Sequence, residues 1–233
     1  MMTPETNHKT AVVFDFGGVL IHWDPFLLYG PHFNNDRAAM QRFLDEIGFA
    51  EWNALQDAGR PFAEGIAELS ARFPQHAALI RAYYERFEET IAGPIQGSVA
   101  ILRALKQQGR TLYGLSNWSA ETFERVRLGF PFLDLLETFV LSGEAGVNKP
   151  DPRIFQVLLE RTGRQAGDCL LIDDSPANVA AAAALLTPIA TPANLMVMDP
   201  GGYKFSDYPK LGLPILALYM LVAVGLVPLI WNL

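Results

Sequence analysis

Two four-residue stretches of the chain, Ala11–Phe14 and Cys169–Ile172, are apolar with no alternating polar positions. An unalternating apolar stretch of this length is typical of a strand that is buried on both faces of a parallel sheet. Further strands are expected at Thr111–Leu115 and Thr138–Leu141.

Helical patterns lie between these strands. Ser98–Gln108 places Val99, Leu102 and Leu105 on one face and is followed by Gly109, a common residue at a helix C-terminus. Further helices are expected near residues 120–127, 151–161 and 175–186, the last two opening with an Asp-Pro and a Ser-Pro pair. Strands that alternate with helices predict an α/β fold with a doubly wound, Rossmann-like parallel sheet.

Residues 26 to about 92 contain no convincing strand and predict a small helical bundle instead. Its expected helices are Asp36–Ile47, Pro61–Phe73 and Gln75–Ile91. Their aromatic side chains are expected to form the core of the bundle rather than to contact a ligand. The predicted parts are therefore a catalytic core of residues 9–24 and 95–186, an inserted helical domain of residues 25–94, and a hydrophobic C-terminal tail of residues 187–233.

Composition and charge narrow the class of protein. Half of the 233 residues are hydrophobic and 18% are charged, as in a globular protein. The net charge is −7 and no basic run occurs, which argues against nucleic acid as a partner. Cys169 is the single cysteine, and the polar stretch Met1–Thr10 lacks the apolar region of a signal peptide. A cytoplasmic protein is expected.

The tail has a different composition from the rest of the chain. Residues 187–233 carry only four charges, and residues 211–231 carry none. A stretch of this length exceeds the roughly 18 apolar residues that indicate a membrane span. Residues 211–231 are therefore a candidate transmembrane helix, through which the protein would contact and be anchored to a membrane.

Polar side chains follow the predicted strands at the points where each strand ends. Asp15 follows the first strand, Ser116 the second, and Asp173 and Asp174 the last, while Lys149 lies in the loop after the remaining strand. The carboxyl ends of parallel strands share one edge of the sheet, so these groups are expected to converge. Three carboxylates at one site require positive charge, which Lys149 and a bound Mg²⁺ would supply.

On these residues, positions 9 to about 186 resemble the haloacid dehalogenase superfamily of hydrolases. Four motifs carry the resemblance: Phe14-Asp15-Phe16-Gly17-Gly18-Val19-Leu20; Leu115-Ser116-Asn117; Ser142-Gly143-Glu144 with Lys149-Pro150-Asp151; and Ile172-Asp173-Asp174-Ser175-Pro176-Ala177-Asn178. The helical insertion between the first two motifs resembles the cap domain of that family.

The resemblance implies a role for each matching residue. Asp15 would be the nucleophile and would form a covalent aspartyl intermediate. Ser116 and the backbone at Asn117 would hold the phosphoryl oxygens, and Lys149 would neutralise negative charge. The remaining implied site residues are Gly17 and Gly18 for substrate binding; Asp15, Asp174, the carbonyl of Gly17 and, as a supporting candidate, Asp173 for Mg²⁺; and Asn178 as a further supporting residue.

Gly17 departs from the pattern of many phosphatases in this family, which have an aspartate there as general acid and base. Loss of such a group typically costs about 10²–10⁴-fold in rate. The site should therefore favour leaving groups that depart without a proton, unless Asp24 or a residue of the helical insertion supplies one.

The predicted function is that of a Mg²⁺-dependent phosphatase of a small phosphorylated metabolite. One alternative is a 2-haloacid dehalogenase, because halide leaves without a proton, although Asp174 argues against this reading. Another is a catalytically weak domain that binds a phosphorylated ligand or a protein at a membrane.

The tail resembles a different kind of protein. Residues 187–233 are similar to the C-terminal end of sodium-coupled dicarboxylate and sulfate transporters, whose other helices the chain lacks. Three explanations remain open. The chain is a fusion or a mis-assembled reading frame, the tail is a genuine membrane anchor, or the tail folds onto the core with Leu195–Met198 as an additional strand.

Overall fold

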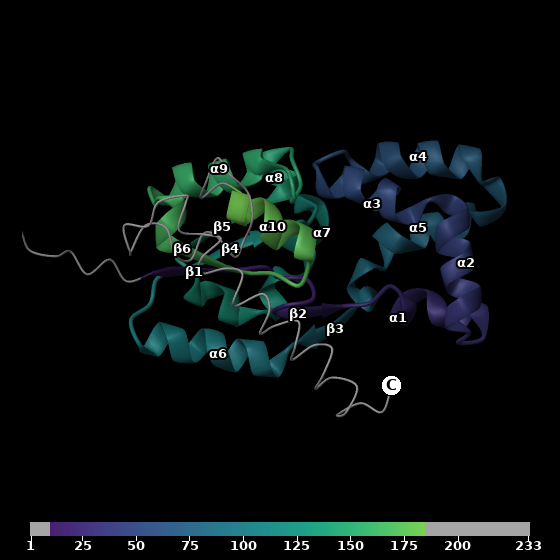
Figure 1. Cartoon of the computed structure of the whole chain (residues 1–233). Helices are drawn as coiled ribbons and strands as arrows, with labels where there is room; N and C mark the ends of the chain where they lie inside the picture. The colour runs from purple at the N-terminus through teal and green to yellow at the C-terminus, as the bar shows by residue number, and fades with distance from the viewer. Residues whose placement is uncertain (1–9, 185–233) are drawn as a thin grey trace, which may run out of the picture. The chain divides into compact units, whose positions relative to one another are not determined.

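The computed structural model describes residues 10–184, which contain a parallel four-stranded sheet with helices on both faces (Figure 1). The strands lie in the order β5-β4-β1-β6. Their bounds are β1 Ala11–Phe14, β4 Leu112–Ser116, β5 Thr138–Leu141 and β6 Cys169–Ile172. The predicted α/β class with a doubly wound sheet is confirmed, and all four predicted strands are present.

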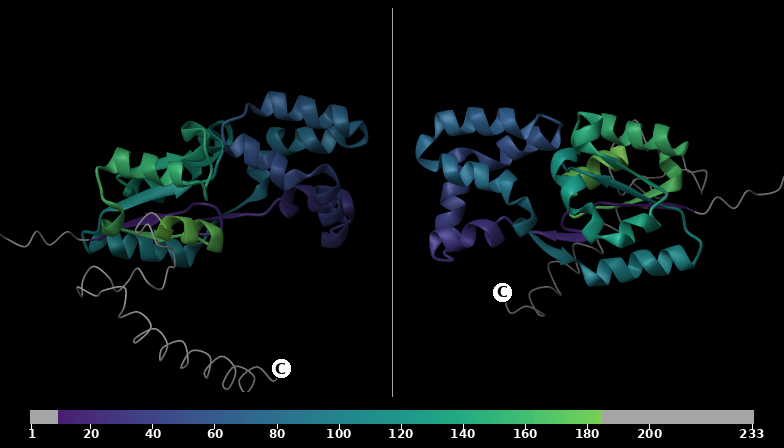
Figure 2. Two further views of the ribbon diagram at one scale, coloured as in Figure 1. Left: turned by 45° about the horizontal axis from the view of Figure 1, so that its top comes forward. Right: turned by 180° about the vertical axis from the view of Figure 1, so that it is seen from behind.

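Side chains of β1 alternate between two hydrophobic layers. Val12 and Phe14 pack in the layer that includes Val99 and Leu102 of α6, whereas Ala11 and Val13 pack in the layer of α9 and α10. Figures 1 and 2 show α6 and α9 on opposite sides of the sheet. The bounds of these core helices are α6 Gln96–Gln107, α7 Ala120–Val126, α8 Ser142–Ala145, α9 Pro152–Thr162 and α10 Pro176–Ala184.

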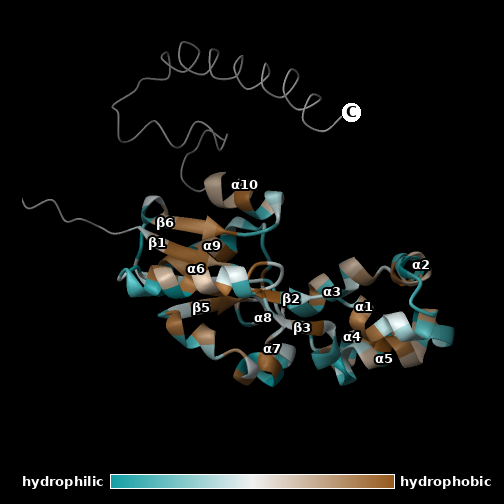
Figure 3. Ribbon diagram, turned by 90° about the horizontal axis from the view of Figure 1, so that it is seen from below, coloured by the Kyte–Doolittle hydropathy of each residue, from teal (hydrophilic) through white to brown (hydrophobic). Residues whose placement is uncertain are grey.

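The strand β6 differs from the prediction of burial on both faces. It is an edge strand among residues 10–184, and Leu170 is 54% exposed. The central strand β1 is buried at every position because β4 and β6 flank it. Figure 3 shows the hydrophobic colouring of β1, β5 and β6 against the mixed colouring of the helices around them.

A helical segment, defined here as residues 26–90, lies between the two strands of a small antiparallel ribbon. The ribbon consists of β2 Ile21–Trp23 and β3 Ile91–Pro94. The sequence pattern indicated neither of these strands, and the expectation that residues 26 to about 92 contain no strand is wrong at its end, where β3 begins. Strands of three and four residues with half-exposed side chains are too short to give a clear alternating pattern.

The helical segment contains α2 Arg37–Ile47 and α4 Phe62–Arg72, close to two of the predicted helices. The third, α5 Ala77–Glu85, is shorter than the predicted Gln75–Ile91, because a 3₁₀ turn and the start of β3 follow it. The segment also contains α1 Phe26–Tyr29 and α3 Phe49–Asp57, which the sequence pattern did not indicate. Short 3₁₀ turns complete it at residues 30–33, 74–76 and 87–90; others lie in the core at residues 127–129, 131–135 and 166–168.

Aromatic rings fill the interior of the helical segment, as predicted. The rings of Phe49 and Tyr83 meet edge to face at 4.9 Å, and Tyr83 also contacts Trp52, Phe62 and Phe87. Edge-to-face and offset pairs add to the stabilisation from burial. A rigid aromatic core therefore holds α3 and α5 against each other.

Within residues 10–184, every helix is too short or too polar to cross a membrane. The candidate span 211–231, the proposed strand Leu195–Met198 and the rest of the tail lie outside the described residues.

Candidate active site

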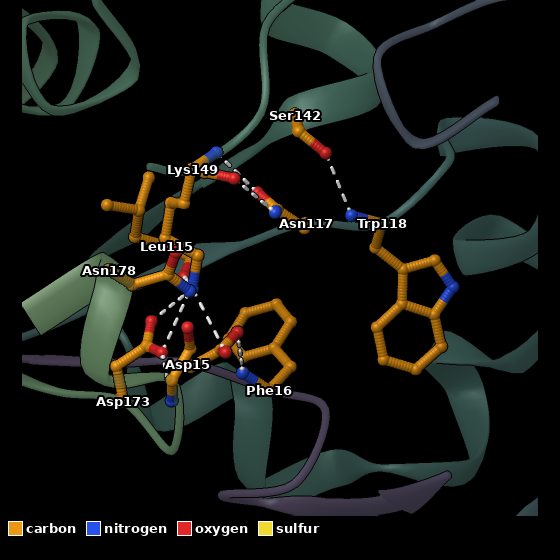
Figure 4. A network of polar contacts seen from close by, with 10 residues as sticks. Asp15, Phe16, Leu115, Asn117, Trp118, Ser142, Lys149, Asp173 and Asn178 are labelled. Carbon is orange, nitrogen blue, oxygen red and sulfur yellow. Dashed lines mark hydrogen bonds and ion pairs between the residues drawn. The ribbon is translucent and has the colours of Figure 1, made fainter. Parts of the chain in front are cut away.

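The carboxyl ends of the sheet strands bring together the polar residues that the sequence singled out. Asp15 follows β1, Asp173 follows β6, and Lys149 comes from the loop beyond α8 (Figure 4). Ser116 ends β4, and Asp174 comes directly after Asp173. These five residues belong to four different parts of the chain. Their predicted convergence is confirmed.

Lys149 is the centre of the polar network. Its Nζ atom lies 3.0 Å from Asp15 Oδ2 and 2.5 Å from Asp173 Oδ2, and it donates a 2.8 Å hydrogen bond to the Leu115 carbonyl. The side chain is fully buried. A buried cation is costly unless it is paired, and here two carboxylates and a carbonyl surround it.

Asp15 is a buried carboxylate in a partly compensated environment. Its Oδ1 atom accepts a 2.7 Å hydrogen bond from the Phe16 N–H. Burial raises the pKa of Asp15 to about 6, and the Lys149 cation and a hydrogen bond from Ser116 oppose this rise. Asp15 therefore remains ionised at neutral pH.

The two consecutive aspartates after β6 have different surroundings. Both carboxylate oxygens of Asp173 already have partners within the chain. Oδ1 accepts hydrogen bonds from the Ser175 N–H and from Asn178 Nδ2, each at 2.9 Å, and Oδ2 pairs with Lys149. Asp174 is exposed and faces the pocket described below. Asp173 thus holds Lys149 in place, while the oxygens of Asp174 face the open space.

One oxygen each from Asp15, Asp173 and Asp174 lie within 4.8 Å of one another, a grouping that fits a metal ion. Gly18 leaves room for the Asp174 side chain, because a Cβ atom at position 18 would lie 2.2 Å from Asp174 Oδ2. Gly18 also has φ = +75°, a backbone conformation that residues other than glycine rarely adopt. Carboxylate oxygens are the ligands that Mg²⁺ prefers.

Asn117 supports the site through the backbone of Lys149. Its Nδ2 donates to the Lys149 carbonyl at 2.8 Å, and its Oδ1 accepts from the Lys149 N–H at 2.7 Å. The Asn117 side chain is therefore committed to positioning Lys149. This leaves the backbone of Asn117 for contact with a ligand, as the sequence analysis expected.

A pocket of about 290 Å³ opens above these residues. Its lining includes most of the site residues expected from the sequence: Asp15, Gly17, Gly18, Ser116, Asn117 and Asp174. The other lining residues come from β2, the helical segment and the loop after β4. The pocket is therefore shared between the sheet edge and the helical segment.

Sequence reasoning missed the other six lining residues, which are Trp23, Asn53, Asp57, Tyr83, Phe87 and Trp118. The aromatic side chains of the helical segment were expected to form its core only, but Tyr83 and Phe87 also line the pocket. The two polar residues, Asn53 and Asp57, lie one turn apart on α3. Asp57 Oδ1 accepts a 3.1 Å hydrogen bond from the Ser119 N–H, and its carbonyl accepts a 2.5 Å hydrogen bond from Ser142 Oγ. Asp57 thus joins α3 to the loop after β4. The only signal in the sequence was a polar i, i+4 pair, which resembles an ordinary solvated helix face.

Asp24, which the sequence analysis named as a substitute proton donor, has another role. Its Oδ1 accepts from the Phe26 N–H at 2.8 Å, and its Oδ2 pairs with Arg37 at 3.0 Å. It is not among the residues that line the pocket in the described part of the chain. Asp24 lies just before α1, where its carboxylate holds the first N–H group of that helix and Arg37.

The raised pKa of Asp57 predicts a pH-dependent stability. Burial raises this pKa from 3.8 to about 7, so between about pH 4 and 7 the folded state holds a proton that the unfolded state has lost. The contribution of this bound proton to the free energy of unfolding is present below pH 4 and is lost as the pH rises through 7. The Asp57→Asn variant has no carboxyl group to titrate, so its Tm should not fall in this way. The difference between the Tm of the variant and that of the unmodified protein should therefore rise by a few degrees between pH 4 and 8. Scanning calorimetry across this range checks the result, and a constant Tm difference would contradict it.

The fold and the polar strand ends together define a hydrolase of the parallel α/β class. A family model described as "Hydrolase: haloacid dehalogenase-like hydrolase" matches residues 9–185, and the chain belongs to this family. The resemblance inferred from the four motifs is thereby confirmed.

Two curated relatives cover most of the chain. One is the sesquiterpene phosphatase astK of Aspergillus oryzae, 24% identical over 175 residues, which cover 75% of this chain and 85% of that protein. The other is a phosphoglycolate phosphatase of Rhodospirillum rubrum, 27% identical over 218 residues, 90% and 86% of the two chains. Among solved structures, the magnesium complex of a HAD family enzyme from Bacteroides thetaiotaomicron has a TM-score of 0.58 at 22% identity, covering 76% of this chain and 89% of that chain.

A third relative is of another kind. The uncharacterized transporter YfbS of Escherichia coli is 43% identical over 53 residues, which cover 23% of this chain but only 9% of the transporter. This short match is consistent with a fusion, which is one of the three explanations left open for the tail.

Proposed function

We propose that the protein is a phosphatase that hydrolyses phosphate monoesters of small metabolites through an aspartyl-phosphate at Asp15. The observation that carries the proposal is the surroundings of Asp15. Its carboxylate lines the pocket beside Ser116 and Asp174 and is paired from behind with the buried Lys149. Phosphoryl transfer depends mainly on positioning and on neutralising charge, and this set of groups supplies both.

The residues of the chain would act in two steps. In the first, a carboxylate oxygen of Asp15 attacks phosphorus, the ester P–O bond breaks, and the alcohol leaves with the bonding electrons and takes a proton from water. Ser116 and the Asn117 backbone hold the phosphoryl oxygens, and Lys149 stabilises their charge. In the second, water attacks phosphorus, which releases inorganic phosphate and restores the Asp15 carboxylate.

The residues at the pocket also fit a Mg²⁺ ion. Asp15, Asp174 and the carbonyl of Gly17 would hold it, since Asp173 is already saturated by Lys149, Ser175 and Asn178. When bound, Mg²⁺ supplies positive charge that offsets the charge of the phosphoryl group.

The comparisons support the phosphatase reading, because two relatives that cover most of this chain are named as phosphatases. We also assign a cap domain to residues 25–94 and the catalytic core to residues 9–24 and 95–186. The support for this division is the position of the helical segment, which enters and leaves through β2 and β3 and lines one side of the pocket.

A colorimetric phosphate assay tests the proposal. With sugar phosphates, acyl phosphates, nucleotides and p-nitrophenyl phosphate, we expect phosphate release that requires Mg²⁺ and falls to background in EDTA. Restoring Mg²⁺ should restore the rate, because the carboxylates alone leave the phosphoryl charge unbalanced. Halide release from a chlorinated acid that persists in EDTA would contradict the proposal and identify a dehalogenase instead.

A further inference from the structure

The pocket has a second end, formed by residues outside the catalytic network. Its lining there is Trp23, Asn53, Asp57, Tyr83, Phe87 and Trp118. We infer that this end binds the leaving group, and that Asp57 with Asn53 selects an uncharged alcohol that bears a hydroxyl group and rejects an alcohol that bears a carboxylate. The inference rests on the proposed phosphatase activity and names its substrate class.

Asp57 is held firmly at this end of the pocket. Its Oδ1 accepts from the Ser119 N–H at 3.1 Å, its Oδ2 accepts from Asn53 Nδ2 at 2.8 Å, and Ser142 Oγ donates to its carbonyl at 2.5 Å. The negative charge of Asp57 also contributes to the raised pKa of Tyr83, so the two side chains are near neighbours. A carboxylate fixed by these contacts cannot swing away from a negatively charged ligand.

The charged residues that line the pocket are all acidic among the described residues. Among the described residues, the pocket is lined by three aspartates, Asp15, Asp57 and Asp174, and by no lysine, arginine or histidine. Lys149 is enclosed behind Asp15 with a fully buried side chain. A bound Mg²⁺ would offset charge at the sheet edge, but no positive group faces Asp57 from the lining. A second carboxylate at this end would meet repulsion without compensation.

Asp57 also supplies the complementary preference. Its two carboxylate oxygens each accept one hydrogen bond from the chain, from the Ser119 N–H and from Asn53 Nδ2, so each keeps a lone pair that a ligand O–H group can fill. A carboxylate offers only acceptors and cannot do so.

The remaining residues of this end fit a carbon skeleton. Four aromatic residues line this end: Trp23, Tyr83, Phe87 and Trp118. The fold alone already buries Tyr83, Phe87 and Trp118. Pre-formed aromatic walls with a few fixed polar groups are typical of small-molecule sites. The favoured substrate is therefore the phosphate monoester of a neutral, hydroxylated alcohol.

A matched pair of esters tests the inference. 2-Hydroxyethyl phosphate and 2-phosphoglycolate share the same phosphate and chain length, but one ends in a hydroxyl and the other in a carboxylate. Assays at pH 8 keep Asp57 ionised, because its pKa is raised only to about 7. We expect kcat/KM to favour 2-hydroxyethyl phosphate by about tenfold or more. In Asp57→Asn the rate on 2-phosphoglycolate should rise and the ratio should fall toward one.

Asp45→Asn is the matched control, since Asp45 is an exposed aspartate of α2 that bonds Gln41 and lies off the pocket lining. This variant should keep the ratio of the unmodified protein. A preference of the unmodified protein for 2-phosphoglycolate, or an unchanged ratio in Asp57→Asn, would overturn the inference.

The proposed function and the inference fail in different ways. If p-nitrophenyl phosphate gives no phosphate with Mg²⁺, the phosphatase proposal fails. Calorimetric binding of the two esters then decides the inference without turnover. Tighter binding of the hydroxylated ester, lost in Asp57→Asn, supports the selection, and equal or reversed affinities refute it.

Discussion

Asp15→Asn is expected to lower Mg²⁺-dependent phosphate release by about 10³-fold or more. The amide has nearly the same size as the carboxylate and keeps an oxygen that can accept the Phe16 N–H. It lacks the negative charge that attacks phosphorus and that pairs with Lys149 at 3.0 Å. The loss should therefore appear in kcat, measured with p-nitrophenyl phosphate.

Two controls separate loss of chemistry from loss of fold. Asp45→Asn changes the same group on the surface of α2 and should keep full activity. Asp15→Asn itself should retain a cooperative thermal transition and bind inorganic phosphate. A variant that keeps more than a tenth of the original kcat would exclude Asp15 as the nucleophile.

Lys149→Met is expected to destabilise the fold as well as to abolish activity. The substitution leaves Asp15 and Asp173 buried at the same place without the cation that lies between them. Removing one partner of a buried ion pair typically costs about 3–5 kcal/mol, which in a protein of this size corresponds to a Tm lower by about 10 °C. Thermal and urea unfolding measure the change.

A double variant makes this prediction specific. In Lys149→Met with Asp173→Asn, one of the two uncompensated charges is removed, so much of the lost stability should return. Activity should not return, because Asp15 still lacks its cationic partner. If the double variant were no more stable than Lys149→Met alone, the pairing of Lys149 with Asp173 would not be the source of the stability.

The sheet and its polar edge could be predicted from the sequence because they depend on local patterns. Short apolar strands such as Ala11–Phe14 are distinct from the capped helices between them, and in a parallel sheet the residue after each strand has only one edge on which to lie. The placement of Asp15, Ser116 and Asp174 around one pocket follows from this geometry.

The residues of α3 could not be predicted for the opposite reason. Asn53 and Asp57 acquire their surroundings from distant segments, since the partners of Asp57 include Ser119 and Ser142. Sequence reasoning instead named Asp24, which is close to the first motif along the chain but is committed to α1 and Arg37. Contacts between residues more than sixty positions apart leave no local pattern.

The pairing of β2 with β3 determines which part of the chain can be replaced without disturbing the main sheet. Ile21 faces Pro94 and His22 faces Gly93, so the chain leaves the core and returns to it at neighbouring points. Whatever is inserted between these points can be exchanged, enlarged or replaced by a tight hairpin without interrupting any strand of the main sheet. If the proposed function holds, the residues for hydrolysis and the residues that select the alcohol lie on parts of the chain that can change separately. Replacing residues 26–90 with a foreign insertion would then be a direct route to a new substrate.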